Sequence, residues 1–369
     1  MNSRVNEIDL LRFLAALSVL FFHYTFRGFT ADAMSVVPYL GFAPFSKYGY
    51  LGVNLFFMIS GFVILMSVGD GNLKKFILSR VIRLYPAFWI ACTLTFVITL
   101  YIGDKHFHAI LMQYLKNLTL ISGFVGVEPM NGVYWTLLVE IRFYILIGIF
   151  LLIYNIKDVE IFLIFWLFLS VLIVFFPTKI LSQIFITNHS GYFIAGAIYF
   201  LIYKNGLNLQ RVSMLMISLA LTIFVSYTQT IPTDIQHYHV AFNPMVTSAI
   251  ISSFFVIMLL VSLKSSGIFS KISYITLGSL TYPLYLIHQN IGFMIFNYGA
   301  KIFKPYSLLI MVISSMLLLA FIVYLFERVI TNYLKRVLGV KKETKEEIKK
   351  RKIEKKIKKM DFKPMKYPL

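Results

Sequence analysis

The chain has 369 residues, of which 59% are hydrophobic and 17% aromatic, and its mean hydropathy is +0.78. This composition excludes a soluble globular domain and is typical of a protein that crosses a membrane several times. The formal net charge is +19, but fifteen of the 35 Lys and Arg residues lie between residues 335 and 366. We expect no nucleic-acid binding, because no aromatic platform or groove-reading motif accompanies this basic segment.

Ten windows are apolar over a length that crosses about 30 Å of hydrocarbon. They predict an all-α, polytopic integral membrane protein with about ten transmembrane helices in one bundle. The ninth window is the least regular, because Gly278, Pro283 and His288 interrupt it. The windows cover residues 8–27, 49–69, 82–102, 134–154, 159–177, 185–203, 211–228, 244–263, 274–297 and 307–327.

The distribution of positive charge predicts an orientation. With the N-terminus in the cytoplasm, Lys74, Lys75, Arg80 and the basic C-terminal segment all fall on the inner side, as the positive-inside rule requires. We expect a multi-pass protein of a bacterial cytoplasmic (inner) membrane, with both termini cytoplasmic and membrane lipid as a partner. The chain then divides into a transmembrane domain, 1–333, and a basic cytoplasmic tail, 334–369, which is either helical or disordered.

Two ionisable residues in the first window are the strongest indication of function. Arg12 and His23 are eleven residues apart, which is close to three helical turns, so both side chains lie on one stripe about 16 Å apart. Ionisable groups inside a membrane helix are costly and usually mark a functional site. Spacing alone also allows the alternative that both residues only anchor the helix at the membrane interfaces.

Further polar residues recur in apolar surroundings. In the second window, GVNLFFMISGF carries Asn54 and Ser60, although its glycines are also typical of close helix packing. Arg80 and Arg83, in RVIRLYPAFW, share one helical face; they could hold phosphates or serve as positive-inside anchors.

Two later motifs add acidic and aromatic groups. Glu140, in WTLLVEIRFY, could act as a base, orient a histidine or pair with an arginine, since a buried carboxylate needs a partner. In SLTYPLYLIHQ, Tyr282, Tyr285 and His288 recur at three-residue steps on a helix that Pro283 is expected to break, a stripe that is also typical of a core.

Other chemistries find no support. The single Cys92 excludes an internal disulfide, and the seven histidines show no metal-ligand spacing, so we expect no metal site. No internal repeat of the kind seen in many transporters is evident.

Together the motifs resemble the membrane-bound acyltransferase family 3, in order and spacing, up to about residue 330. The resemblance implies transfer of an acyl group, often acetyl, from cytoplasmic acyl-CoA to a hydroxyl of a cell-envelope glycan, macrolide or similar acceptor. The chain has no G-D-S tripeptide, so it is similar to the stand-alone form without an SGNH hydrolase-like domain. The matching segments are Arg12 with His23, and residues 52–62, 80–89, 135–144 and 279–288.

The resemblance and the residues lead to one mechanistic hypothesis. Arg80, Arg83 and Arg12 bind the phosphates of acetyl-CoA or another acyl-CoA, and His23 acts as general base toward an acceptor hydroxyl on an O-antigen, exopolysaccharide or other cell-surface or lipid-linked glycan. Glu140 completes the catalytic set. The substrate or oxyanion candidates are Asn54, Ser60, Trp135, Tyr285 and His288.

Two other classes of protein remain as alternatives. Ten spans and buried polar groups also suit a transporter or flippase of a lipid-linked sugar, and a non-catalytic membrane scaffold would tolerate the loss of His23 and Glu140. The sequence leaves open the acceptor sugar, the acyl group, direct transfer against an acyl-enzyme, the role of the tail, and whether the chain forms a homo-oligomer.

Overall fold

A computed structural model describes residues 4–69 and 71–339, which form helices and connecting loops without a β-strand. The first half contains α1 (Asn6–Phe22), η1 (His23–Arg27), α2 (Gly28–Thr30), α3 (Ala43–Ser46), η2 (Lys47–Leu51), α4 (Gly52–Val68), α5 (Leu73–Ile102), α6 (Leu111–Asn117), η3 (Ser122–Val125), η4 (Gly132–Tyr134) and α7 (Trp135–Ile153). The second half contains η5 (Ile156–Asp158), α8 (Val159–Phe175), α9 (Lys179–Ile184), α10 (Thr187–Asn205), α11 (Leu209–Val225), η6 (Ser226–Thr230), α12 (Ile231–Tyr238), α13 (Pro244–Ser262), η7 (Gly267–Ser270), α14 (Ile275–Gly299) and α15 (Pro305–Val337).

Nine helical segments in the described part of the chain are long and apolar enough to cross a membrane. The predicted all-α, polytopic fold is therefore confirmed, and the protein is a multi-pass membrane protein. The ninth predicted window corresponds to α14, which is not among the nine segments. At 25 residues α14 is about 37 Å long, so its polar residues, and not its length, set it apart.

Several helix boundaries differ from the apolar windows. α5 begins at Leu73, so Arg80 and Arg83 lie inside the helix and not at its start. α15 runs to Val337, ten residues beyond its window. The expected break at Pro283 is wrong, because α14 continues through this residue. An apolar window covers only the residues suited to hydrocarbon. A helix can extend beyond that window into polar residues, because its backbone hydrogen bonds do not depend on apolar side chains.

The chain divides into two compact units, Met1–Glu327 and Arg328–Leu369, and all packing and site geometry below belong to the first unit. Residues 340–369, most of the predicted basic tail, lie outside the described residues. The boundary at residue 333 and the nature of the tail therefore stay predictions.

Close packing of α4 against α10 forms the centre of the first unit. A Cβ atom added at Gly61 would collide with the backbone carbonyl of Phe193, and one added at Gly196 would collide with the carbonyl of Met58. Because neither glycine has a side chain, the two backbones approach directly, as small residues allow in membrane helices. The packing interpretation of the glycine in the second window is confirmed at Gly61.

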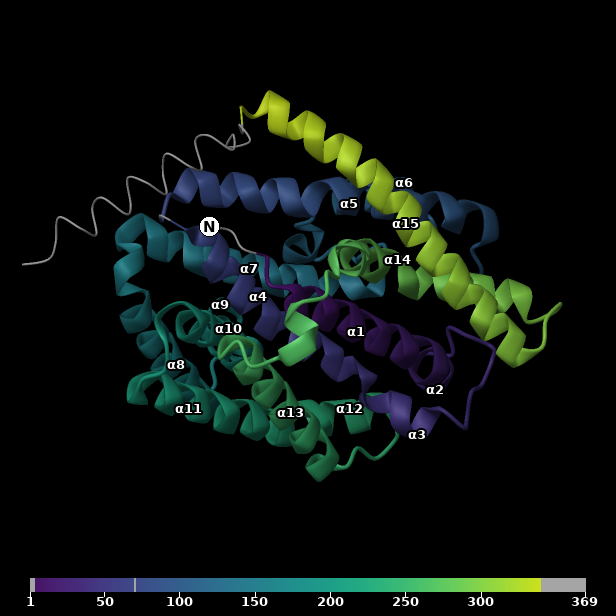
Figure 1. The fold of residues 1–369 in the computed structure, drawn as a ribbon. Coiled ribbons are helices and arrows are strands. Elements are labelled where there is room, and N and C mark those ends of the chain that lie inside the picture. Colours follow the sequence, from purple (N-terminus) through teal and green to yellow (C-terminus); the bar gives the residue numbers. More distant parts are fainter. Residues whose placement is uncertain (1–3, 70, 340–369) are drawn as a thin grey trace, which may run out of the picture. The chain divides into compact units, whose positions relative to one another are not determined.

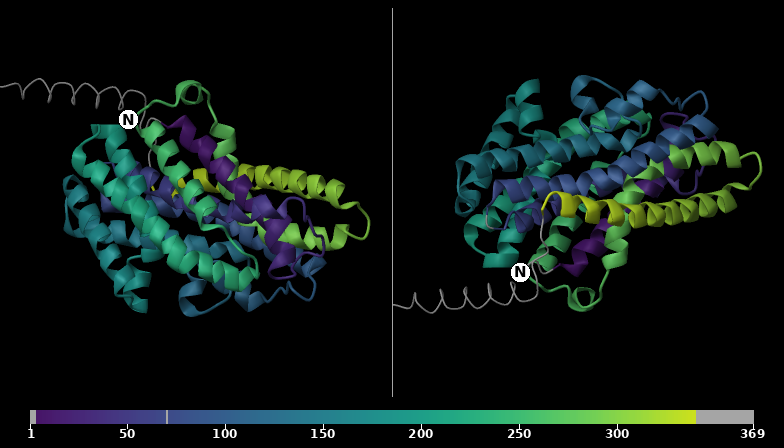
Figure 2. Two further views of the ribbon diagram at one scale, coloured as in Figure 1. Left: turned by 90° about the horizontal axis from the view of Figure 1, so that it is seen from below. Right: turned by 90° about the horizontal axis from the view of Figure 1, so that it is seen from above.

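The less apolar α14 lies beside α1 and α5 (Figure 1), and the further views show α1 and α14 side by side (Figure 2). Two tyrosines bind the three helical segments together. Tyr24 in η1 donates to the backbone oxygen of His288 at 2.7 Å, and Tyr282 donates to the backbone oxygen of Leu84 at 3.2 Å. The histidine of α14 is thereby held next to the end of α1.

Candidate active site

The first helix contributes to two neighbouring cavities. Arg12, in its second turn, lines one cavity, and His23, directly after its last residue, lines the other. Val53 and Tyr285 line both, so the two spaces adjoin. We call them the Arg12 cavity and the His23 cavity. Their volumes, about 100 Å³ and about 170 Å³, are each several times what one water molecule requires.

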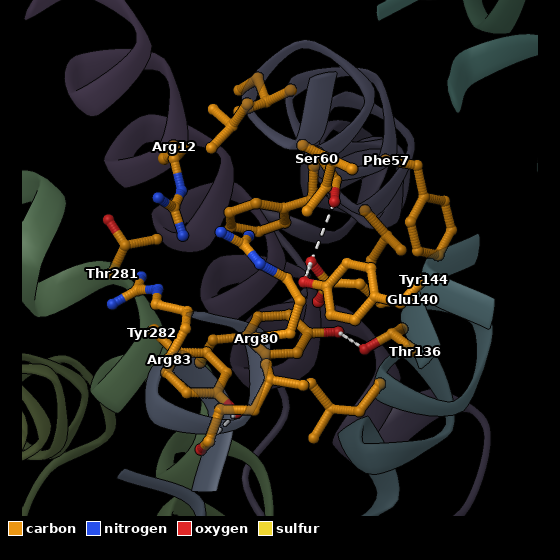
Figure 3. A pocket seen from close by; sticks show the side chains of 18 residues that line it. Arg12, Phe57, Ser60, Arg80, Arg83, Thr136, Glu140, Tyr144, Thr281 and Tyr282 are labelled. Atoms are coloured by element: carbon orange, nitrogen blue, oxygen red, sulfur yellow. Dashed lines mark hydrogen bonds between the residues drawn. The ribbon is translucent and has the colours of Figure 1, made fainter. Parts of the chain in front are cut away.

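The Arg12 cavity is rich in positive charge. The guanidinium groups of Arg12, Arg80 and Arg83 face the same space (Figure 3). Arg83 Nη1 lies 3.6 Å from Glu327 Oε1, whereas no carboxylate within residues 4–69 and 71–339 pairs with the other two arginines. Arginine forks that no carboxylate neutralises are suited to bind an anion with several oxygens, such as a phosphate.

Arg80 is held by aromatic rings and hydroxyl groups, and no carboxylate of the described residues pairs with it. The carbon of its guanidinium lies 5.8 Å from the ring centroid of Phe76 and 5.7 Å from that of Tyr144. Its Nε donates to Ser79 Oγ at 3.1 Å. Cation–π contacts and one hydrogen bond fix the plane of the fork without neutralising its charge.

Glu140 supplies the carboxylate of the Arg12 cavity. Its Oε1 accepts hydrogen bonds from Ser60 Oγ, at 2.9 Å, and from the hydroxyl of Tyr144 one turn later in α7. Figure 3 shows these three side chains together on one wall. The carboxylate therefore holds α4 against α7, and it lies in the cavity that does not contain His23.

His23 begins the five-residue π-helix η1 and is 4% exposed. Its Nδ1 is buried and accepts or donates no hydrogen bond among the described residues. Single π-helical turns inside α-helices occur frequently at functional sites, since they turn a side chain out of the regular register. The imidazole packs edge-on to Phe22, with ring centroids 5.2 Å apart.

Four further polar atoms in the wall of the His23 cavity are buried without a hydrogen-bond partner in the part of the chain that the structure describes. Buried polar atoms are normally paired, so an unpaired group facing a cavity is suited to a polar ligand. One of them comes from η6, the second π-helix that borders this cavity. The four atoms are Tyr50 OH, His189 Nδ1, Ser226 Oγ and Asp234 Oδ2; the hydroxyl of Tyr50 and the carboxylate of Asp234 also lie close enough to interact with each other.

The junction of the cavities contains a hydroxyl that is already engaged. Thr136 Oγ1 donates to the backbone oxygen of Val133 at 2.9 Å, and it lies 2.9 Å from the hydroxyl of Tyr285. Since a hydroxyl has one proton, Tyr285 must be the donor in the second bond. In this arrangement Tyr285 presents lone pairs, and not a proton, to the junction.

Comparisons with known proteins identify the family. The model of the acyltransferase domain of acyltransferase family 3 matches residues 5–326, most of the chain. The chain belongs to this family. This acyltransferase is 28% identical, over 76% of its length and 82% of the relative, to a protein named as an acetyltransferase in Acidianus two-tailed virus. It is 31% identical to nodulation protein 10 of Rhizobium leguminosarum bv. viciae over 38% of the chain and 42% of the relative. No solved structure matches it.

The structure places all but one of the predicted site residues of this acyltransferase around the two cavities. His288 lines neither cavity and lies beside His23. The Arg12 cavity contains Arg12, Ser60, Arg80, Arg83, Glu140 and Tyr285. The His23 cavity contains His23, Asn54, Trp135 and Tyr285. The chemical roles of these residues stay predictions.

Sequence reasoning did not find the far wall of the His23 cavity. Asp234 lies in α12, which continues the seventh window through η6, whereas residue 234 falls between the apolar windows 211–228 and 244–263. His189, at the start of α10, is a polar residue in an apolar window, and that contrast was the available signal. His189 packs against Trp135, with ring centroids 5.9 Å apart.

Proposed function

We propose that the protein is an O-acyltransferase that moves an acyl group, most simply acetyl, from cytoplasmic acyl-CoA to a hydroxyl of a cell-surface glycan on the other side of a bacterial cytoplasmic membrane. One observation carries this proposal: a cationic cavity and a cavity with unpaired polar atoms meet at Val53 and Tyr285, and one helix contributes to both. Such an arrangement suits an anionic donor and a neutral, hydroxylated acceptor that arrive from opposite sides.

The donor occupies the Arg12 cavity in this proposal. Phosphates of acyl-CoA bind the forks of Arg80 and Arg83, with Arg12 deeper along the same wall. These arginines lie near the N-terminal ends of α1 and α5, the side on which Lys74 and Lys75 also lie in the sequence. The positive-inside rule then supports a cytoplasmic donor, with both termini cytoplasmic if α14 also crosses.

The reaction itself takes place between His23 and the junction. An acceptor hydroxyl gives its proton to His23 while its oxygen attacks the carbonyl carbon of the thioester. The carbon–sulfur bond then breaks, and the sulfur of CoA leaves with the proton that His23 returns. Asn54 is the best oxyanion donor of the predicted set, because it lines the cavity of His23 and its amide uses one proton toward Tyr192, at 3.1 Å.

The acceptor occupies the His23 cavity. Hydroxyl groups of a sugar can exchange hydrogen bonds with His189, whose Nδ1 is unpaired among the described residues, and can donate to Asp234, whose carboxylate also lies close to the hydroxyl of Tyr50. Trp135, which is 44% exposed, offers an aromatic face of the kind on which sugar rings stack. The relative named as an acetyltransferase supports acetyl as the transferred group.

The test combines an assay of the purified enzyme with an analysis of the acetyl esters on the surface polysaccharide of cells. Protein in detergent is given acetyl-CoA together with base-treated surface polysaccharide as acceptor, without a membrane gradient, and release of free CoA is followed. In parallel, acetyl esters on surface polysaccharide are measured by proton NMR before and after mild base, in strains with the wild type, His23→Ala or neither protein. The control is His106→Ala, an exposed histidine outside both cavities.

We expect consumption of acetyl-CoA and base-labile acetyl signals for the wild type and the control only. No consumption by folded wild-type protein would refute acyl transfer from acyl-CoA and favour a transporter. Consumption without polysaccharide esters in any strain would refute the glycan as acceptor, and retained activity in His23→Ala would refute its role as base.

A further inference from the structure

His288 is fixed in one protonation pattern by its own helix. Its Nδ1 lies 2.8 Å from the backbone oxygen of Tyr285 and 3.2 Å from that of Leu284. A carbonyl oxygen only accepts, so this nitrogen must carry the proton. In the neutral ring the other nitrogen, Nε2, is then a bare acceptor. The residue is 1% exposed, so water does not compete for this atom.

Two unpaired ring nitrogens lie close together at this place. Nε2 of His288 and Nδ1 of His23 are both buried and without a hydrogen-bond partner among the described residues. The two ring centroids are 5.1 Å apart, and the ring planes are tilted by 59°. One nitrogen is an acceptor, and the other can be a donor, so a rotation of the His23 ring toward His288 would pair two atoms that otherwise remain unsatisfied.

The backbone around the two rings is held firmly. Tyr24, the neighbour of His23 in η1, donates its hydroxyl to the backbone oxygen of His288 at 2.7 Å. A Cβ atom added at Gly292 would collide with the hydroxyl oxygen of Tyr24, so the glycine is what lets this tyrosine reach α14. The hydrogen bond ties the element that carries His23 to the element that carries His288, and it limits how far the rings can separate.

No other group takes this orienting role. Glu140, which sequence reasoning considered as a partner of a histidine, accepts hydrogen bonds from Ser60 and Tyr144 in the other cavity. No carboxylate of the described residues pairs with His23, and its remaining ring neighbours are Phe22 and Phe293.

We propose that His288 is a positioning residue whose Nε2 accepts a hydrogen bond from Nδ1–H of His23. This bond selects the tautomer of His23 in which Nε2 carries the lone pair, which is the atom a general base needs for the acceptor hydroxyl. When His23 takes up the proton of the acceptor and becomes an imidazolium, the same hydrogen bond from Nδ1–H to His288 stabilises the positive charge. The inference rests on the proposed function of His23, and it makes His288 a partner of the base instead of a group that touches substrate.

Three substitutions separate positioning from packing. His288→Gln keeps an acceptor oxygen near the place of Nε2. His288→Asn is shorter and keeps a polar group only near Nδ1. His288→Leu removes both. We expect kcat to fall roughly 10-fold to 100-fold in His288→Leu and His288→Asn, by analogy with lost partners of metal-bound histidines. The KM for acetyl-CoA should change little, and His288→Gln should restore most of kcat.

A second readout observes the tautomer without any reaction. Nitrogen NMR of protein labelled with 15N-histidine distinguishes a protonated ring nitrogen from a bare one, and the His23→Ala spectrum assigns the signals of His23. We expect a protonated Nδ1 in the wild type and in His288→Gln, and a mixture of tautomers in His288→Leu.

The two readouts separate the failure of this inference from the failure of the proposed function. An unchanged tautomer of His23 in His288→Leu, or a His288→Gln variant as slow as His288→Leu, would overturn the inference even if the wild type transfers acetyl. A wild type that does not consume acetyl-CoA would overturn the proposed function, and the tautomer would still decide whether His288 orients His23.

Discussion

The Arg80→Lys substitution isolates donor binding from folding. Arg83 is a poorer choice, because its loss would leave Glu327, 9% exposed, without the arginine that lies 3.6 Å away. Arg80 has no such partner. Its contacts are the rings of Phe76 and Tyr144, the hydroxyl of Tyr144 and Ser79, and lysine keeps the positive charge over the rings. The change therefore removes the fork and little else.

The expected magnitude follows from one lost hydrogen bond. A hydrogen bond to a charged group contributes about 1.5–3 kcal/mol, which corresponds to roughly a 10-fold to 150-fold higher KM for acetyl-CoA. A phosphate far from the thioester is bound equally in the ground state and the transition state, so kcat should stay within about threefold. The same substitution should not alter the KM for the acceptor.

The assay compares acetyl-CoA with acetyl-pantetheine, which keeps the thioester and lacks the phosphates. Arg80→Lys should raise the KM for acetyl-CoA and leave that for acetyl-pantetheine unchanged. Arg142→Lys is the matched control, because its guanidinium lies over Phe124, 5.2 Å from the ring centroid, and lines neither cavity. Equal effects on both donors, or a loss confined to kcat, would refute phosphate binding by Arg80.

Three further predictions concern the fold and the acceptor. Glu140→Gln should keep the thermal stability near that of the wild type, whereas Glu140→Leu leaves two half-buried hydroxyls without their acceptor and should lower the stability by about 1 kcal/mol, measured as a lower melting temperature. Gly196→Ala should lower the melting temperature, since its Cβ meets a backbone carbonyl, while Gly148→Ala, which meets only a side chain at 3.8 Å, should not. Asp234→Asn should raise the KM of the acceptor and not that of acetyl-CoA, measured by varying each substrate separately.

The class of the fold could be predicted because a membrane restricts what a sequence can form. Long apolar segments must be helices, since hydrocarbon offers no partner for backbone groups. The ends of those helices could not be predicted in the same way. α5 begins nine residues before its apolar window, and its first hydrogen-bonded turn is capped by Asn72, whose side chain accepts from the backbone nitrogen of Lys75.

Residues of the candidate site could be predicted where one helix or one short motif contains them. Arg12 and His23 lie on one helix, and the pair Arg80 and Arg83 is one turn apart, so spacing alone places them. Asp234 reaches the His23 cavity only because α11 continues through a π-helix into α12 and because this segment packs near the end of α1. No periodicity in the sequence predicts that α11 continues into α12 or that this segment packs near the end of α1.

Glu140 and His288 show the same limit within the recognised motifs. Both are polar residues in apolar segments, and either could have oriented His23. Tertiary packing decides between them: Glu140 meets Ser60 across the α4–α7 contact, and His288 meets His23 across the η1–α14 contact. Which partner a buried group finds depends on helix contacts that lie far apart in the sequence.

The junction of the two cavities explains why the base should belong to the acceptor side. On the proposed mechanism the thioester reaches a wall formed by Val53, which has no polar atom, and Tyr285, whose proton is given to Thr136. Neither side chain can act as a base there, so the base that deprotonates the attacking hydroxyl comes from the His23 cavity. The arginines then decide how tightly the donor binds, whereas the His23 cavity decides both which acceptor enters and whether it is deprotonated. Arg80→Lys should therefore alter the KM for acetyl-CoA, and Asp234→Asn should alter the KM for the acceptor. If both substrates bound in one common cavity, each substitution would alter both KM values.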